Sequence, residues 1–274
     1  MKKSKKMNTY LKYGIILLCA AIGGGFLGIM MMEWGLDFVF SGIMPHLTHL
    51  IELVQANMAL EVLLLLIIEV FVGESAIKKM KALAADVVNA EDEEGDRIEY
   101  EMEKLGAVAT GILNAVAVIG FIVLSTGYSI EYIRMLAITD AVGMFGISAM
   151  VLLLAAFFIF MLLFVYQGYW GVRFVKMQQK IDPKKKGDPT SIKFTEQWVE
   201  SCDEAEKELI YQSAFNSFTL LMKWCPILMA IALFMHMFWD TGITAVVFIG
   251  IVNLMLNVSY LKNGVVKRKQ KLNR

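Results

Sequence analysis

Polar side chains inside long apolar segments are the residues of this sequence best placed to do chemistry. Glu61 and Glu69 both fall in one such segment. A carboxylate within a membrane span costs roughly 2.5–3.5 kcal/mol to insert, so it normally faces the helix bundle and has a partner. Two interpretations stay open: a proton or cation relay, or an ion-paired residue that reaches the membrane surface.

Two other apolar segments also carry polar residues. Lys223 lies near one end of its segment, where we expect it to reach Glu69 or Glu74 across a bundle. Asn253 and Asn257 are four residues apart and therefore share one face of a helix. In a further apolar segment, 106–126, Asn114 is the polar member, and we expect it to form a hydrogen bond with another helix.

A metal site is the third kind of chemistry to consider. His46, His49 and Glu52 are spaced by three residues, which would place them on one face of a helix, as metal ligands require. The same spacing fits an ordinary polar face on an interfacial helix, and we expect no metal and no cofactor. The cysteines form no CxxC pair and no metal-ligand spacing: Cys19, Cys202 and Cys225.

No catalytic motif is recognisable in the chain. The sequence has no HExxH motif, no phosphate-binding loop and no paired nucleophile and base. We therefore expect no catalytic residues, no cofactor-binding residues and no enzymatic activity.

The elements that must position these residues are membrane spans. Hydrophobic residues make up 57% of the 274 residues, and soluble domains are nearer 45–50% apolar. Because a span of the bilayer needs about 20 apolar residues and must satisfy its own backbone, the sequence predicts an all-α polytopic helix bundle. We predict one integral membrane domain over 1–274, with six transmembrane helices near 14–34, 58–75, 106–126, 144–166, 218–239 and 243–261.

Charge placement predicts how the chain is threaded. Lysine and arginine cluster at both ends and in the long segments 77–104 and 173–217, whereas the other loops contain only Arg134. The positive-inside rule then places both termini and these two helical extensions in the cytoplasm of a multi-pass plasma membrane protein. The apolar core of 14–34 is too long for a cleaved signal peptide. We also expect Gly95 to break or loosen a helix, and 127–143 to hold a re-entrant or interfacial helix.

The most distinctive polar stretch is 198–218, WVESCDEAEKELIYQSAFNSF. Its acidic first turn complements a helix dipole, and its apolar residues continue into a predicted span. The pattern DE-x4-[IL]-x-Y occurs here and again at 92–100, at a constant offset of 111 residues, which suggests a parallel repeat. The stretch is either a solvated helical extension or a docking surface, for which the candidate residues are Asp203, Glu204, Glu208 and Tyr211.

The residues GDPTSIKFTEQWVESCDEAEKELIYQSAFNSF, with GGGFLG in the first predicted span and the acidic segment 91–103, carry a family resemblance. The chain resembles the bacterial integral membrane domain-of-unknown-function family 3169. The resemblance implies a membrane protein of Gram-positive bacteria, a companion of helix-turn-helix regulators or of peptide-export systems. It supplies no catalytic residues, and Tyr211 is a family-like position without a known role.

We therefore expect a non-enzymatic membrane protein that docks a cytoplasmic protein partner, such as a regulator or an export component. The alternative is a small transporter or a peptide-immunity protein that uses the intramembrane polar residues. The expected surroundings are the lipid bilayer, and no nucleic acid is expected to bind directly. The sequence leaves the oligomeric state open.

Overall fold

The computed structural model describes residues 11, 14–15, 18–19, 22–26, 41–42, 44–87, 92–139, 141–143, 146–239 and 241–272. Much of the predicted first span, 14–34, therefore lies outside the described residues, as do residues 1–10 ahead of it.

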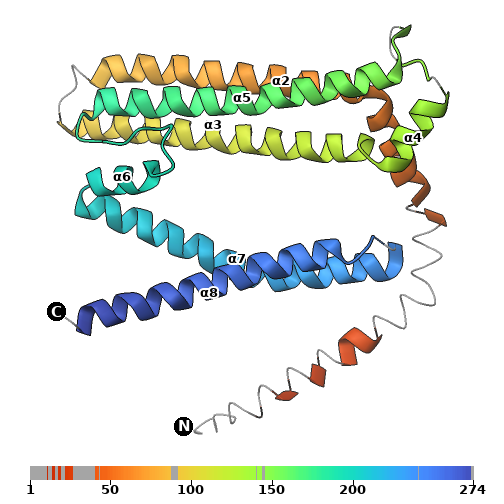
Figure 1. The fold of residues 1–274 in the computed structure, drawn as a ribbon. Helices are drawn as coiled ribbons and strands as arrows, with labels where there is room; N and C mark the ends of the chain where they lie inside the picture. Colours follow the sequence, from red (N-terminus) through yellow and green to blue (C-terminus); the bar gives the residue numbers. More distant parts are fainter. Residues whose placement is uncertain are drawn as a thin grey trace, which may run out of the picture. The chain divides into compact units, whose positions relative to one another are not determined.

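The described part of the chain is all α-helical, as predicted (Figure 1). Outside the helices, it contains a single isolated β-bridge between Val142 and Ser148. The helices are α2 (Met44–Val87), α3 (Asp92–Gly127), α4 (Ile130–Thr139), α5 (Ala149–Ile181), α6 (Phe194–Ser201), α7 (Glu204–Trp239) and α8 (Thr244–Leu272).

Five of the described helices are long and apolar enough to cross a membrane, as in a multi-pass membrane protein. These segments are Met44–Asp86, Arg97–Gly127, Ala149–Ile181, Glu204–His236 and Thr244–Asn263.

The helices extend well beyond the predicted apolar segments. With 44 residues, α2 is about 66 Å long, which is twice the roughly 30 Å of hydrocarbon in a bilayer. It joins the stretch that carries His46, His49 and Glu52, the predicted span 58–75 and the start of the segment 77–104 in one helix. The change from apolar to polar residues marks a change of surroundings, and the backbone stays helical across it.

Two local expectations have different outcomes. Gly95 lies inside the first turns of α3, so the prediction that it breaks the helix is wrong. A single glycine costs a helix only about 1 kcal/mol, and the flanking residues carry the helix through it. The segment 127–143 contains a short helix, α4, and its re-entrant or interfacial placement stays a prediction.

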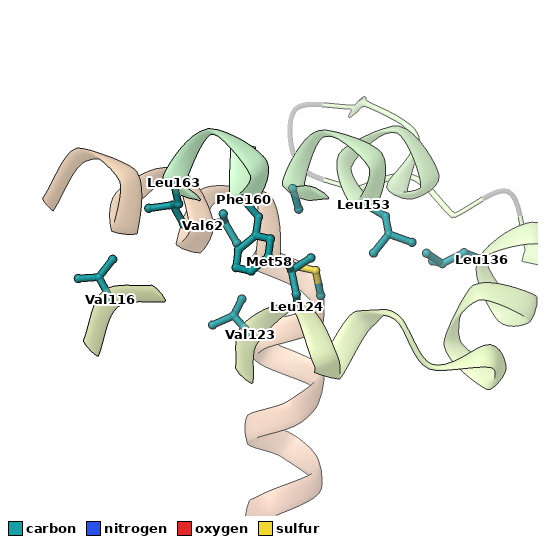
Figure 2. Close-up of a cluster of buried hydrophobic side chains, with 10 residues drawn as sticks. Met58, Val62, Val116, Val123, Leu124, Leu136, Leu153, Phe160 and Leu163 are labelled. Carbon is teal, nitrogen blue, oxygen red and sulfur yellow. The ribbon is translucent and has the colours of Figure 1, made fainter. Parts of the chain in front are cut away.

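The contacts divide the chain into two compact units, Met1–Phe194 and Thr195–Arg274. In the first unit, α2, α3 and α5 lie side by side along their length, and α4 lies at one end of the three (Figure 1). Apolar side chains from all four helices form the first apolar cluster (Figure 2). Its fully buried members are Val62, Ala156 and Leu163.

A second apolar cluster fills the other half of this unit. It is built from α2, α3 and α5, and its buried side chains are Ala76, Ile77, Met80, Met102, Ala109, Leu113, Trp170 and Met177. The Trp170 ring stacks on Phe174, with ring centroids 5.3 Å apart.

The second unit contains the helix pair α7 and α8. Gly242 occupies the turn between them with φ of 77°, a conformation that glycine adopts without strain. Phe218 of α7 stacks on Tyr260 of α8 with centroids 4.8 Å apart. Pro226 lies inside α7, and the helix continues on both sides of it.

Candidate functional site

The most unusual polar side chain in the described structure is Glu69. It lies on the face of α2 that also carries Met58, Val62, Gly73 and Met80, and these positions recur at helical spacing. Helical periodicity therefore turns Glu69 toward α3 and α5. Its residue surface is fully buried.

Glu69 lies between the two apolar clusters. Along α2, the first cluster ends at Leu66 and the second begins at Val72. Both carboxyl oxygens of Glu69 are buried, and neither has a hydrogen-bond partner. An unpaired buried charge is costly, so this position must be neutral or must gain a counter-charge or water.

One turn further along, α2 and α5 approach each other closely at Gly73. The Nε1–H of Trp170 donates a hydrogen bond of 3.0 Å to the carbonyl oxygen of Gly73. A Cβ atom at position 73 would lie 2.8 Å from Cδ1 of Trp170 and would also overlap the hydroxyl of Tyr166. Glycine at 73 is therefore what allows this contact.

An ion pair adjoins the contact. The Arg173 guanidinium binds the Glu74 carboxylate with two hydrogen bonds, of which Nη2 to Oε2 is 3.0 Å. The Tyr166 hydroxyl lies 3.1 Å from Oε1 of Glu74 and 3.3 Å from the carbonyl oxygen of Val70, so it can donate to either. Arg173 also lies over the ring of Tyr169, 5.1 Å from its centroid, in a cation–π contact.

A hydrogen-bonded amide pair lies at a similar level of the unit. Nε2 of Gln167 donates to Oδ1 of Asn114 over 2.7 Å and joins α5 to α3. Together with Glu69, Glu74, Tyr166 and Arg173, this pair makes a polar layer, defined here as those residues. Within this layer, Glu69, Asn114 and Gln167 lie between the two apolar clusters, and Glu74, Tyr166 and Arg173 lie beside the second cluster.

The sequence pointed to Glu69 but missed most of its neighbours. In the sequence, Tyr166 ends the predicted span 144–166, Trp170 follows it, and Arg173 begins the basic segment 173–217. Their spacing of four and three residues places them on one face of α5, and that spacing could have shown that they act together.

The other predicted intramembrane residues lie apart from the polar layer or in the second unit. Glu61 is partly buried on α2, two turns before Glu69. Asn253 and Asn257 do share one face of α8, where Nδ2 of Asn257 donates to the Asn253 carbonyl oxygen over 2.9 Å. Both residues are only partly buried, and Nδ2 of Asn257 also lies 3.2 Å from Oδ1 of Asn253, so these contacts stay within α8.

The Lys223 pairing stays a prediction. Lys223 is exposed on α7, in the second unit. Its proposed partner Glu74 is bound by Arg173 of α5 in the structure. The carboxyl oxygens of Glu69, the other proposed partner, are buried without a hydrogen-bond partner.

The start of α7 carries the candidate docking residues. Asp203 and Glu206 form a capping box: Oδ1 of Asp203 accepts the Glu206 N–H over 2.8 Å, and Oε2 of Glu206 accepts the Asp203 N–H over 3.0 Å. Glu204 binds Lys207 at 3.0 Å, and Glu208 accepts a hydrogen bond from Gln212.

Beyond the capping box, one face of α7 carries exposed side chains. A shallow hollow there is lined by Glu204, Lys207, Glu208, Tyr211, Gln212 and Phe215. Tyr211 is 60% exposed and Phe215 is 56% exposed. The equivalent segment of the suspected repeat begins α3 at Asp92, so both segments start a long helix.

The loop between α5 and α6 is ordered by two Asp-Pro turns. Oδ1 of Asp182 accepts the N–H of Lys184 over 2.9 Å, and Oδ1 of Asp188 accepts the N–H of Thr190 over 2.9 Å. The Thr190 hydroxyl also donates to Oδ1 of Asp188, over 2.7 Å. These bonds close each turn with a side chain, as aspartate favours.

The predicted metal-ligand spacing lies in the first turns of α2. His46, His49 and Glu52 are all exposed there. Among the described residues, no group of three or more histidine, cysteine, aspartate or glutamate side chains is arranged to hold a metal ion.

Comparisons with known proteins give one match, to a family model. The model for Protein of unknown function (DUF3169) matches residues 6–264, which is nearly the whole chain. No curated protein and no solved structure match. The chain therefore belongs to the family described as Protein of unknown function (DUF3169).

Proposed function

We propose that this chain is a multi-pass protein of a bacterial plasma membrane, with six crossings and both termini in the cytoplasm. The five candidate spans support multiple crossings, and 14–34 supplies the sixth. Lysine and arginine at both ends and in the segments 77–104 and 173–217 support the orientation. One integral membrane domain then includes both compact units.

Its function in this proposal is to dock a cytoplasmic protein, without catalysis. The observation that carries it is the exposed hollow on α7, which combines carboxylates with two aromatic rings. Exposed aromatic side chains are enriched where proteins bind one another. Glu204 and Glu208 add negative charge, so the partner surface is basic and apolar.

The capping box gives this surface a defined geometry. Because Asp203 and Glu206 fix the first turn of α7, Glu208 and Tyr211 are held on a helix that continues into a candidate span. A partner bound there could act on the membrane part of the chain, or be held at the membrane by it.

A small transporter or a peptide-immunity protein is the second candidate, and Glu69 favours it. A buried carboxyl group in a candidate span is typical of residues along ion pathways. The two apolar clusters argue the other way, because they fill the first unit on both sides of Glu69. Docking is therefore the better supported function.

Site-specific photocrosslinking in intact cells tests the docking function. A photoreactive amino acid at Tyr211 or Phe215, which share one face of α7, should give one protein adduct of the same partner mass. Ser213 is exposed on the opposite side of that turn and is the matched control, from which we expect no such adduct.

Charge reversal makes the test specific. Glu208→Lys should abolish the Tyr211 adduct, whereas Asp203→Asn, which can still cap the helix, should retain it. Adducts that are equally strong from Ser213, or that survive Glu208→Lys unchanged, would contradict docking through this face. Transport is tested separately, since in proteoliposomes Glu69→Gln should alter the flux of the transported ion or peptide if the second candidate is correct.

A further inference from the structure

The docking surface on α7 makes no use of Glu69, a buried charged residue type in the first unit. Its carboxyl group is fully buried, and both oxygens lack a hydrogen-bond partner. Apolar clusters close the unit on both sides of it. A side chain so placed requires a ligand that removes its charge.

The surrounding groups do not supply a counter-charge. On α2, Glu74 is a second carboxylate, and it is already bound by Arg173 of α5. On α5, Tyr166 is close enough to interact electrostatically with Glu69, but its single hydroxyl proton is directed to Glu74 or to the Val70 carbonyl oxygen. On α3, the sequence between Lys104 and Gly127 contains no titratable side chain.

We propose that Glu69 is a proton-binding site whose occupancy holds α2, α3 and α5 together. With the proton bound, the neutral carboxyl group packs between the helices at the polar layer. When the proton leaves, the carboxylate is an unpaired charge in an apolar interior, which is strongly unfavourable. The helices must then separate at this level until water or a cation reaches the oxygens.

The contacts beside Glu69 connect this event to the rest of the unit. The Tyr166 hydroxyl can donate to the Val70 carbonyl oxygen or to Glu74, and Trp170 donates to the Gly73 carbonyl oxygen, so these bonds join α5 to the same turns of α2. Separation of the helices at Glu69 breaks these bonds. The amides of residues 66–76 are thus the place to detect it.

Carbodiimide labelling of the full-length protein in nanodiscs tests proton binding. Dicyclohexylcarbodiimide adds to a protonated carboxyl group in apolar surroundings, so Glu69 should be modified at low pH, as measured by peptide mass spectrometry. The label should fall by about tenfold for each pH unit above the titration midpoint. Glu69 that stays unlabelled at every pH would overturn the proposal.

Hydrogen–deuterium exchange tests the coupling to structure. In the wild-type protein, after correction for intrinsic exchange, amides 66–76 should exchange faster as the pH rises, whereas Glu69→Gln should keep them protected throughout. Glu52→Gln is the matched control, because Glu52 is an exposed carboxylate on the same helix. The Glu52→Gln variant should exchange like the wild type.

If Glu69→Gln fails to insert into the membrane, Glu69→Leu matches the flanking apolar side chains and serves instead. A wild-type pH response that persists in these neutral variants contradicts the proposal.

Discussion

The Nε1–H of Trp170 donates a 3.0 Å hydrogen bond to the backbone carbonyl oxygen of Gly73, across the contact between α5 and α2. That carbonyl lies within a helix, so the indole uses its second lone pair. The contact is possible because position 73 has no side chain.

Gly73→Ala should therefore destabilise the first unit. The added Cβ would lie 2.8 Å from Trp170 Cδ1, and overpacking of this kind costs about 1–3 kcal/mol. This exceeds the gain of about 1 kcal/mol in helix propensity. Thermal unfolding in detergent measures the effect. Gly111→Ala is the control: a Cβ there meets nothing within 4 Å, so it should be neutral or stabilising.

The Glu74–Arg173 pair should contribute a modest coupling energy. The side chains of Arg173 and Glu74 are 24% and 47% exposed, so solvent or lipid headgroups weaken the pair. A double-mutant cycle with Glu74→Gln and Arg173→Met should give about 1 kcal/mol or less. Arg173→Lys should lose part of it, because an ammonium group cannot form the two parallel bonds. Stability of Arg173→Lys equal to that of the wild type would contradict the bidentate geometry.

The apolar pattern predicted which segments form long helices, because each span must satisfy its own backbone. It did not predict where they end. Residues 77–87 continue α2, and residues 92–105 belong to α3, since a polar helix surface needs no break in the backbone. The start of α7 was better indicated, because acids in a first turn are a capping signal.

The candidate site was predictable only in part. The sequence alone identified Glu69 as a carboxylate in an apolar segment, and in the structure its side chain is buried. The partner of Glu74 was not predictable, because which helices adjoin is set by packing between segments about 100 residues apart. Charge alone does not single out one basic residue as the partner of Glu74, and the structure pairs it with Arg173 of α5, which packs on α2 together with α3.

Asp203→Ala should destabilise the start of α7. Its carboxylate accepts the Glu206 N–H, and loss of such a cap costs about 1 kcal/mol. Faster hydrogen exchange of the amides of residues 204–207 would show the effect. Glu208→Ala is the matched control, because it loses only an exposed contact to Gln212, with a cost of roughly 0.2–0.5 kcal/mol. Equal effects of the two changes would mean that the cap is not stabilising.

The Asp188 turn should loosen at low pH. The Thr190 hydroxyl, then the Thr190 N–H, and more weakly Lys176, hold the pKa of Asp188 below its usual value. Because the pKa of Asp188 is lower in the folded turn, the contribution of Asp188 to stability is fully present above the unfolded pKa and is lost as the pH falls through the folded pKa.

Thr190→Val removes the hydroxyl bond, so the pKa of Asp188 should rise toward the ordinary aspartate value. NMR titration of a selectively labelled Asp188 carboxyl carbon measures this directly. Thr195→Val, five residues further along the chain, is the control and should leave the titration of Asp188 unchanged; the same low midpoint in Thr190→Val would show that the hydroxyl does not lower it.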